Sequence, residues 1–189
     1  ALVDLLGKPI AECHALCIPT AQWGHPMCGP ASVRGFIAAG TDFRYLSGLG
    51  WASLGVLELT ALPTIGAKRW VPWLREADAL LVDGGDATYL CHWMRESGLA
   101  DLLPSLDGTV WVGLSAGSMV MSPRIGEDFV GWKPPTGGDN TLDDWQRRTT
   151  SSESRIARSW ILAEAGKSLA TTEDIEFLEK FGEALHKLS

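Results

Sequence analysis

Two short apolar segments that each run into a glycine-containing turn constrain the fold of this chain more than any other feature. The first is Ala79–Val82, which leads into Gly84-Gly85, and the second is Thr109–Val112, which leads into the pentapeptide Gly113–Gly117. Continuous apolar segments of this length, separated by helical patterns, are typical of parallel strands that are covered on both faces. Ligands bind such sheets beyond the carboxyl ends of the strands, so both glycine turns are expected at the ligand-binding edge.

The rest of the chain predicts alternating helices and strands, and therefore an α/β fold with a mainly parallel sheet between two helical layers. Its 189 residues suffice for one such domain with a sizeable core. The expected helices are 1–10 (closed by Gly7 and Pro9), 31–39 (capped by Gly40), 67–76 (broken by Pro72), 88–96 and 99–106, and the expected strands are 14–19, 55–59, 79–82 and 109–113.

The pentapeptide Gly113–Gly117 has the pattern G-x-S-x-G with Ser115 at its centre. After a buried strand, this pattern is typical of a nucleophile elbow, a tight turn that lifts the serine hydroxyl above the edge of the sheet. The amide of Ala116, at the start of the following helix, would then face a developing oxyanion. The alternative is a turn of small residues that lets a helix pack closely on the strand.

The second turn, Asp83-Gly84-Gly85-Asp86, offers a bare backbone amide at the end of the neighbouring strand. Beside Ser115, such an amide would complete an oxyanion hole with that of Ala116. Asp86 also fits the N-cap position of the next helix, and the two interpretations are compatible.

Charge and composition exclude several classes of function. The net charge of −7 argues against nucleic acid and anionic membranes as partners, and no apolar stretch is long enough to span a membrane. No signal peptide is recognised, so a cytoplasmic protein with free thiols is expected. Cys13, His14 and Cys17 have a spacing that could suggest metal, but alternate residues of a strand face opposite sides, so neither a metal site nor a cofactor is predicted.

The two glycine turns together resemble the peptidase E/cyanophycinase family of serine peptidases, which has the class I glutamine amidotransferase-like fold. The resemblance rests on Ala79–Leu90 and, about twenty-five residues later, on Gly113–Ser118, and it extends over about residues 14–132. It implies that Ser115 is the nucleophile and that Gly85 and Ala116 supply the oxyanion-hole amides. A serine at this position, where the amidotransferases have cysteine, favours the peptidase branch.

Two parts of the family pattern are not recognised in this sequence. One is a strand before the first helix, and the other is an F-P-H strand after the elbow that carries the general base. A deletion, a shifted reading frame and an omitted segment are the open explanations. The candidates for a base or an orienting group are His25, in the loop after the first strand, and Glu127 or Asp128; His14, His92 and His186 are expected to pack or to face solvent.

The expected organisation is a core at 1–132, a linker at 133–152 and a helical tail at 153–189, with helices at 153–169 and from Thr171 onward. The tail either packs on the domain or docks on a partner chain, so a homo-oligomer is left open. The resemblance implies a hydrolase for small peptides, with aspartyl peptides as typical substrates and an acyl-enzyme on Ser115. The alternative is a catalytically inactive relative that acts as a scaffold or interaction module.

Overall fold

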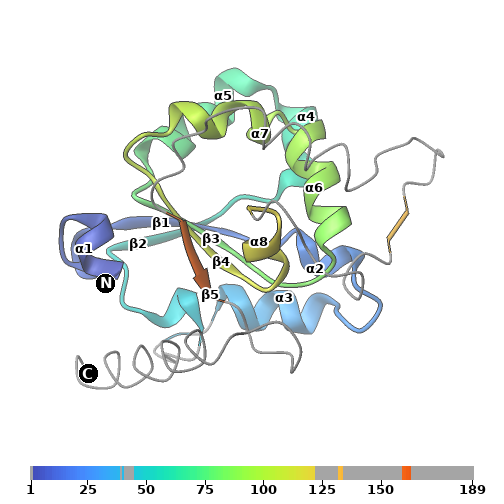
Figure 1. The fold of residues 1–189 in the computed structure, drawn as a ribbon, viewed down its shortest axis with the longest axis horizontal. Coiled ribbons are helices and arrows are strands. Elements are labelled where there is room, and N and C mark those ends of the chain that lie inside the picture. Colours follow the sequence, from blue (N-terminus) through green and yellow to red (C-terminus); the bar gives the residue numbers. More distant parts are fainter. Residues whose placement is uncertain (1, 39, 41–44, 122–131, 134–158, 163–189) are drawn as a thin grey trace.

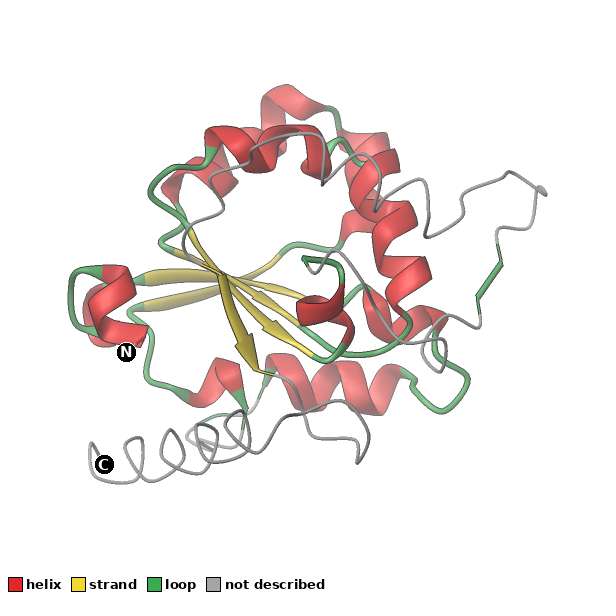
Figure 2. Cartoon of the chain, in the orientation of Figure 1, coloured by secondary structure: helices red, strands yellow, loops and turns green. Residues whose placement is uncertain are grey.

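The computed structural model describes residues 2–38, 40, 45–121, 132–133 and 159–162 (Figure 1). These residues form a five-stranded sheet with helices on both faces (Figure 2). The strands are β1 (His14–Ile18), β2 (Ser53–Val56), β3 (Ala79–Val82), β4 (Val110–Leu114) and β5 (Ser159–Leu162). Their order is β2-β1-β3-β4-β5, and each neighbouring pair is parallel.

Helical segments connect the strands and supply the two outer layers. The α-helices are α1 (Leu2–Leu6), α2 (Ala21–Gly24), α3 (Pro30–Ile37), α4 (Leu62–Ile65), α5 (Ala67–Glu76), α6 (Ala87–Glu96), α7 (Leu99–Leu102) and α8 (Ala116–Met119). Short 3-10 turns occur at Ile10–Glu12, Leu46–Gly48, Leu59–Ala61 and Leu103–Ser105.

The core consists of two apolar layers, one on each face of the sheet. Leu80 and Val82 of β3 point to the layer built with α4–α8, whereas Ala79 and Leu81 point to the layer built with α1 and α3. Figure 1 shows α4–α7 on one side of the sheet and α1 and α3 on the other. All four β3 residues are buried because a central parallel strand is covered on both faces. The predicted three-layer α/β/α fold with a parallel sheet is confirmed.

Three expectations about the elements need correction. Pro72 does not break α5, which runs through it. Proline has no amide hydrogen, so the Lys68 carbonyl lacks its helical hydrogen bond. Both residues lie on the exposed side of the helix, where water can donate a hydrogen bond to that carbonyl. The second strand is Ser53–Val56 rather than 55–59, and the chain turns into a 3-10 helix at Leu59.

The third correction concerns the expected helix at 153–169. Residues Ser159–Leu162 form β5, which continues the sheet beside β4, with Val112 paired to Trp160. A strand after the elbow was not recognised in the sequence, but four residues with Trp160, Ile161 and Leu162 fit a parallel edge position as well as a helix. The rest of the predicted linker and helical tail lies outside the described residues.

In the part of the chain that the structure describes, no helix has both the length and the apolar character needed to cross a bilayer.

Candidate functional site

The carboxyl end of β4 carries the sharpest turn of the structure. The strand ends at Leu114, Ser115 follows with φ 48° and ψ −113°, and α8 begins at Ala116. Among the described residues, Ser115 is the one non-glycine residue with a positive φ. L-residues avoid this region, and such strain is typical of functional turns. The backbone therefore has the geometry expected of a nucleophile elbow, with Ser115 half-buried at its tip.

The glycines of the pentapeptide are required by close packing. A Cβ on Gly113 would lie 2.4 Å from the carbonyl carbon of Gly117, and a Cβ on Gly117 would lie 2.3 Å from the Val82 oxygen of β3. Buried side chains then fix the turn: the Trp111 indole donates to the Gly117 oxygen at 2.8 Å, and the Ser118 hydroxyl donates to the Gly113 oxygen at 2.7 Å. The same turn therefore lets α8 pack closely on β4 and has the shape expected of a nucleophile elbow.

The second glycine turn lies against Ser115. A Cβ on Gly84 would be 3.1 Å from the Ser115 Cβ and 3.7 Å from its Oγ. Gly85 adopts φ 138°, and a Cβ there would lie 2.2 Å from the Ala21 oxygen at the start of α2. Only glycine fits between α2 and the tip of β3. The fold thus brings the two motifs together at the carboxyl edge of the sheet, as their sequence pattern predicted.

The backbone amides of the two turns differ in their availability. The Gly84 amide donates to the Asp83 carboxylate at 2.8 Å, so it is occupied. Within the described residues, the Gly85 amide makes no backbone hydrogen bond, and the Ala116 amide, as the first of α8, has no acceptor in its own helix. The two amides expected in an oxyanion hole are therefore left without an acceptor among the described residues.

Asp83 and Gln22 form a buried polar pair beneath the glycine turn. The carboxylate of Asp83 accepts a hydrogen bond from the Gln22 side-chain amide nitrogen, and both residues are more than nine-tenths buried. Burial raises the pKa of the neighbouring Cys17 thiol to about 12, and the charge of Asp83 acts in the same direction. The sequence analysis did not single out this pair. Its only signal was an acidic residue directly after a buried strand.

Asp86 begins α6 as predicted. Its carboxylate accepts the Tyr89 amide at 2.8 Å, which is the N-cap bond. The other oxygen accepts the Trp132 amide at 2.9 Å, and the Trp132 ring packs on Tyr89 and His92 at centroid distances of 5.0 Å. His92 therefore packs against aromatic rings, which agrees with the expectation that it packs or faces solvent.

The described histidines His25 and His14 form hydrogen bonds with groups other than Ser115. The His25 Nδ1 accepts the Met27 amide at 3.2 Å, which directs the ring into its own loop. His14 lies at the amino end of β1, where its Nδ1 contacts the Ser53 hydroxyl at 2.7 Å. No hydrogen bond joins Ser115 Oγ to a side chain among the residues that can be described.

The other predicted acid and base residues lie outside the described part of the chain. These are Glu127 and Asp128; His186, which was expected to pack or to face solvent, also lies outside the described residues. Their relation to Ser115 therefore stays a prediction.

A second polar network joins the carboxyl ends of β1 and β2. Glu58 accepts hydrogen bonds from the Thr20 hydroxyl at 2.8 Å and from the Trp23 indole at 3.0 Å. The Thr60 amide and hydroxyl bond to the same carboxylate. The sequence analysis placed Glu58 inside a strand and missed this role, because the partners come from two separate loops.

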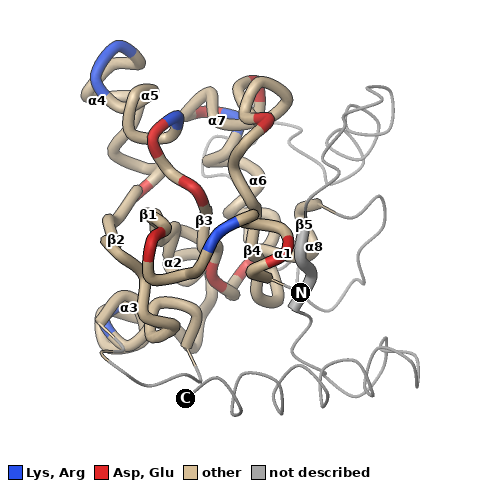
Figure 3. The backbone as a smooth tube through the Cα atoms, turned by 90° about the vertical axis from the view of Figure 1, so that its left-hand side faces the viewer, with Lys and Arg blue, Asp and Glu red and all other residues tan. Residues whose placement is uncertain are grey.

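Basic and acidic residues both occur along the described backbone (Figure 3). Within the described residues, no group of three or more His, Cys, Asp or Glu side chains is arranged to hold a metal ion. The four cysteines are free thiols. The site is thus built from backbone amides, one serine and buried polar side chains.

Comparisons with known proteins find a matching family and a similar solved structure. The model of peptidase family S51 matches residues 2–135. A putative peptidase E protein from Listeria monocytogenes EGD-e has a crystal structure that aligns with a TM-score of 0.45 and 19% sequence identity, covering 76% of this chain and 68% of that one. No curated protein matches the sequence.

Proposed function

Because the chain belongs to peptidase family S51, we propose that it is a serine peptidase that hydrolyses small peptides through an acyl-enzyme on Ser115. The observation that carries the proposal is the strained backbone of Ser115, at φ 48°, on a turn that packs against a second glycine turn. This strain holds the hydroxyl at the tip of the elbow, where the glycines let the two turns pack closely together.

In the proposed reaction, Ser115 Oγ attacks the carbonyl carbon of the scissile peptide bond and gives its proton to a general base. The amides of Gly85 and Ala116 donate to the resulting oxyanion. The C–N bond then breaks, the leaving amine takes the proton, and water hydrolyses the ester to regenerate the serine. Aspartyl peptides are the proposed substrates, since they are typical of the family that the sequence resembles.

The general base is proposed among His25, Glu127 and Asp128, with a carboxylate as the orienting group if the base is histidine. His25 would have to release its bond to the Met27 amide or present its other nitrogen. A serine hydroxyl without a base is a poor nucleophile at neutral pH, so the identity of this group decides the rate.

The alternative function is a catalytically inactive relative that serves as a scaffold or interaction module. The observation in its favour is that no side-chain base bonds to Ser115 within the described residues. The two functions differ in one measurable property, the reactivity of the Ser115 hydroxyl.

The test is covalent labelling with a fluorophosphonate, read by intact mass, together with hydrolysis of an aspartyl dipeptide. We expect one adduct on the wild-type protein, none on Ser115→Ala, and a full adduct on Ser105→Ala, whose serine lies on the surface. The wild type and Ser105→Ala should hydrolyse the dipeptide, and Ser115→Ala should not. An unlabelled and inert wild type, next to a control serine hydrolase that reacts, would refute the peptidase proposal and favour the scaffold.

A further inference from the structure

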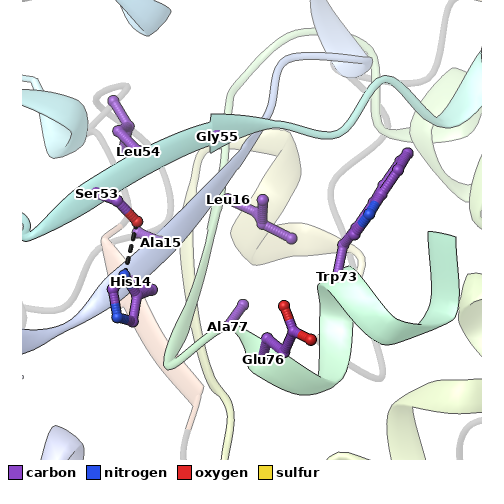
Figure 4. Close-up of a pocket in the computed structure, with 9 residues that line it drawn as sticks. All are labelled: His14, Ala15, Leu16, Ser53, Leu54, Gly55, Trp73, Glu76 and Ala77. Atoms are coloured by element: carbon purple, nitrogen blue, oxygen red, sulfur yellow. Dashed lines mark hydrogen bonds between the residues drawn. The ribbon is translucent and has the colours of Figure 1, made fainter.

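A cavity lies at the amino-terminal ends of β1 and β2, whereas Ser115 lies at the carboxyl end of β4. It has a volume of about 600 Å³ and is lined by the first residues of β1 and β2 and by the end of α5 (Figure 4). His14 and Ser53 are the first residues of their strands, whereas Ser115 follows the last residue of β4. The cavity is therefore separate from the peptidase site, and its volume falls within the range of about 300–1,000 Å³ of small-molecule sites.

The walls of the cavity are mainly apolar. Leu16 of β1 and Ala77 directly after α5 form its floor, and Trp73 of α5 forms its rim. Figure 4 shows the Trp73 ring on the far side of the space into which Leu16 points. Trp73 is 40% exposed and Leu16 is half-buried, so water meets a larger apolar area here than one isolated side chain would present. An apolar ligand body would cover this area.

One carboxylate faces this apolar surface. Glu76 is three residues after Trp73, so both side chains lie on the same side of α5. No described cation pairs with Glu76. The nearby carboxylate of Asp78, by contrast, is already engaged by Lys8 at 2.9 Å and by the His14 amide at 2.7 Å. Glu76 is thus the negative charge that the cavity offers to a ligand.

The polar side opposite Glu76 consists of His14 and Ser53. The His14 Nδ1 and the Ser53 hydroxyl are 2.7 Å apart and bond to each other. Their mutual bond leaves the second ring nitrogen of His14 for a hydrogen bond with a ligand, without adding a second negative charge. The cavity therefore combines an aromatic face, an aliphatic floor and one anion.

We propose that this cavity binds a small organic cation, a primary amine with an aromatic or branched apolar body. The ammonium group would bond to the Glu76 carboxylate, the Trp73 ring would add a cation–π contact, and the apolar body would cover Leu16 and Ala77. An anionic ligand would meet Glu76 as a like charge. This site is independent of the peptidase proposal, because none of its residues takes part in that reaction.

The test is a titration of the full chain with 2-phenylethylamine, followed by NMR shifts of the tryptophan indole N–H groups. The Trp73 signal is identified by its loss in Trp73→Phe. We expect saturable shifts of this signal with a Kd of about 1 mM or tighter, a reasonable affinity for so small a ligand. The neutral analogue 2-phenylethanol should bind about three- to tenfold more weakly, since it lacks the charge.

The decisive comparison uses two glutamates that each end a helix. Glu76→Gln should remove the preference for the amine over the alcohol, whereas Glu96→Gln, on the exposed end of α6, should keep it. Ser115→Ala should bind the amine as the wild type does. Equal affinity for amine and alcohol in the wild type, an unchanged preference in Glu76→Gln, or no saturable shift up to about 10 mM would each overturn the proposal.

Discussion

Replacement of Gly117 by alanine tests whether the elbow depends on the close approach of α8 to β3. The new Cβ would lie 2.3 Å from the Val82 oxygen and 2.8 Å from the Val82 carbonyl carbon. Ordinary van der Waals distance would require a separation of about 1 Å more. Both contacts are backbone atoms of the central strand, so no flexible side chain can yield, and α8 itself must move.

Overpacking of this kind costs about 1–3 kcal/mol, and rigid backbone contacts place Gly117→Ala at the upper end of that range. For a chain of 189 residues, about 3 kcal/mol corresponds to a melting temperature lower by about 6–12 °C. Moving α8 also displaces Ser115, so the variant should lose its fluorophosphonate adduct even at temperatures where it remains folded.

The matched control is Gly35→Ala in α3. Apart from its chain neighbours and the backbone of its own helix, no atom lies within 4 Å of a Cβ at Gly35, and its backbone is helical. Alanine should therefore stabilise the protein by about 0.5–1 kcal/mol, because it restricts the unfolded chain more than glycine does. Thermal unfolding followed by circular dichroism measures both variants. A Gly117→Ala protein that melts at or above the wild type, with the expected gain for Gly35→Ala, would refute the reasoning about the elbow.

Two further predictions concern buried side chains, the Trp111 indole and the cysteine thiols. Trp111→Phe should lower the free energy of unfolding, measured by urea titration, by about 1–3 kcal/mol, because the Gly117 oxygen loses its indole donor. An unchanged urea midpoint would show that this hydrogen bond does not stabilise the fold. Burial raises the pKa of the Cys17 and Cys91 thiols to about 12, so neither forms a thiolate at pH 8. Iodoacetamide at this pH should modify the half-buried Cys28 in the native protein, and should reach Cys17 and Cys91 only after unfolding. Equal native rates for all three thiols, measured by peptide mass, would contradict this expectation.

The central strands and the two glycine turns were predictable because their signals are local. Residues 79–82 are apolar at every position, so a strand buried on both faces was the natural interpretation. The N-cap role of Asp86 was also predictable, since capping involves a residue and the amide three positions later. The strained conformation of Ser115 followed from the glycines on either side of it.

The errors fell where local pattern and tertiary context disagree. Four residues around Trp160 have no period that separates a strand from a helix, and only the free edge of β4 makes them β5. Pro72 predicted a break, but the solvent-facing position of the affected carbonyl lets α5 continue. Both outcomes depend on what surrounds the segment, which the segment itself does not encode.

The sequence by itself determined the parallel α/β fold and the serine turn, because hydrophobic patterning and glycine placement act between residues close along the chain. Only the tertiary structure decided which groups meet at that turn. It placed Gly84 against Ser115, engaged its amide with Asp83 and left the amides of Gly85 and Ala116 without a described acceptor. Such contacts join residues about thirty positions apart, and their geometry is fixed by the register of β3 beside β4, which depends on the packing of both faces of the sheet.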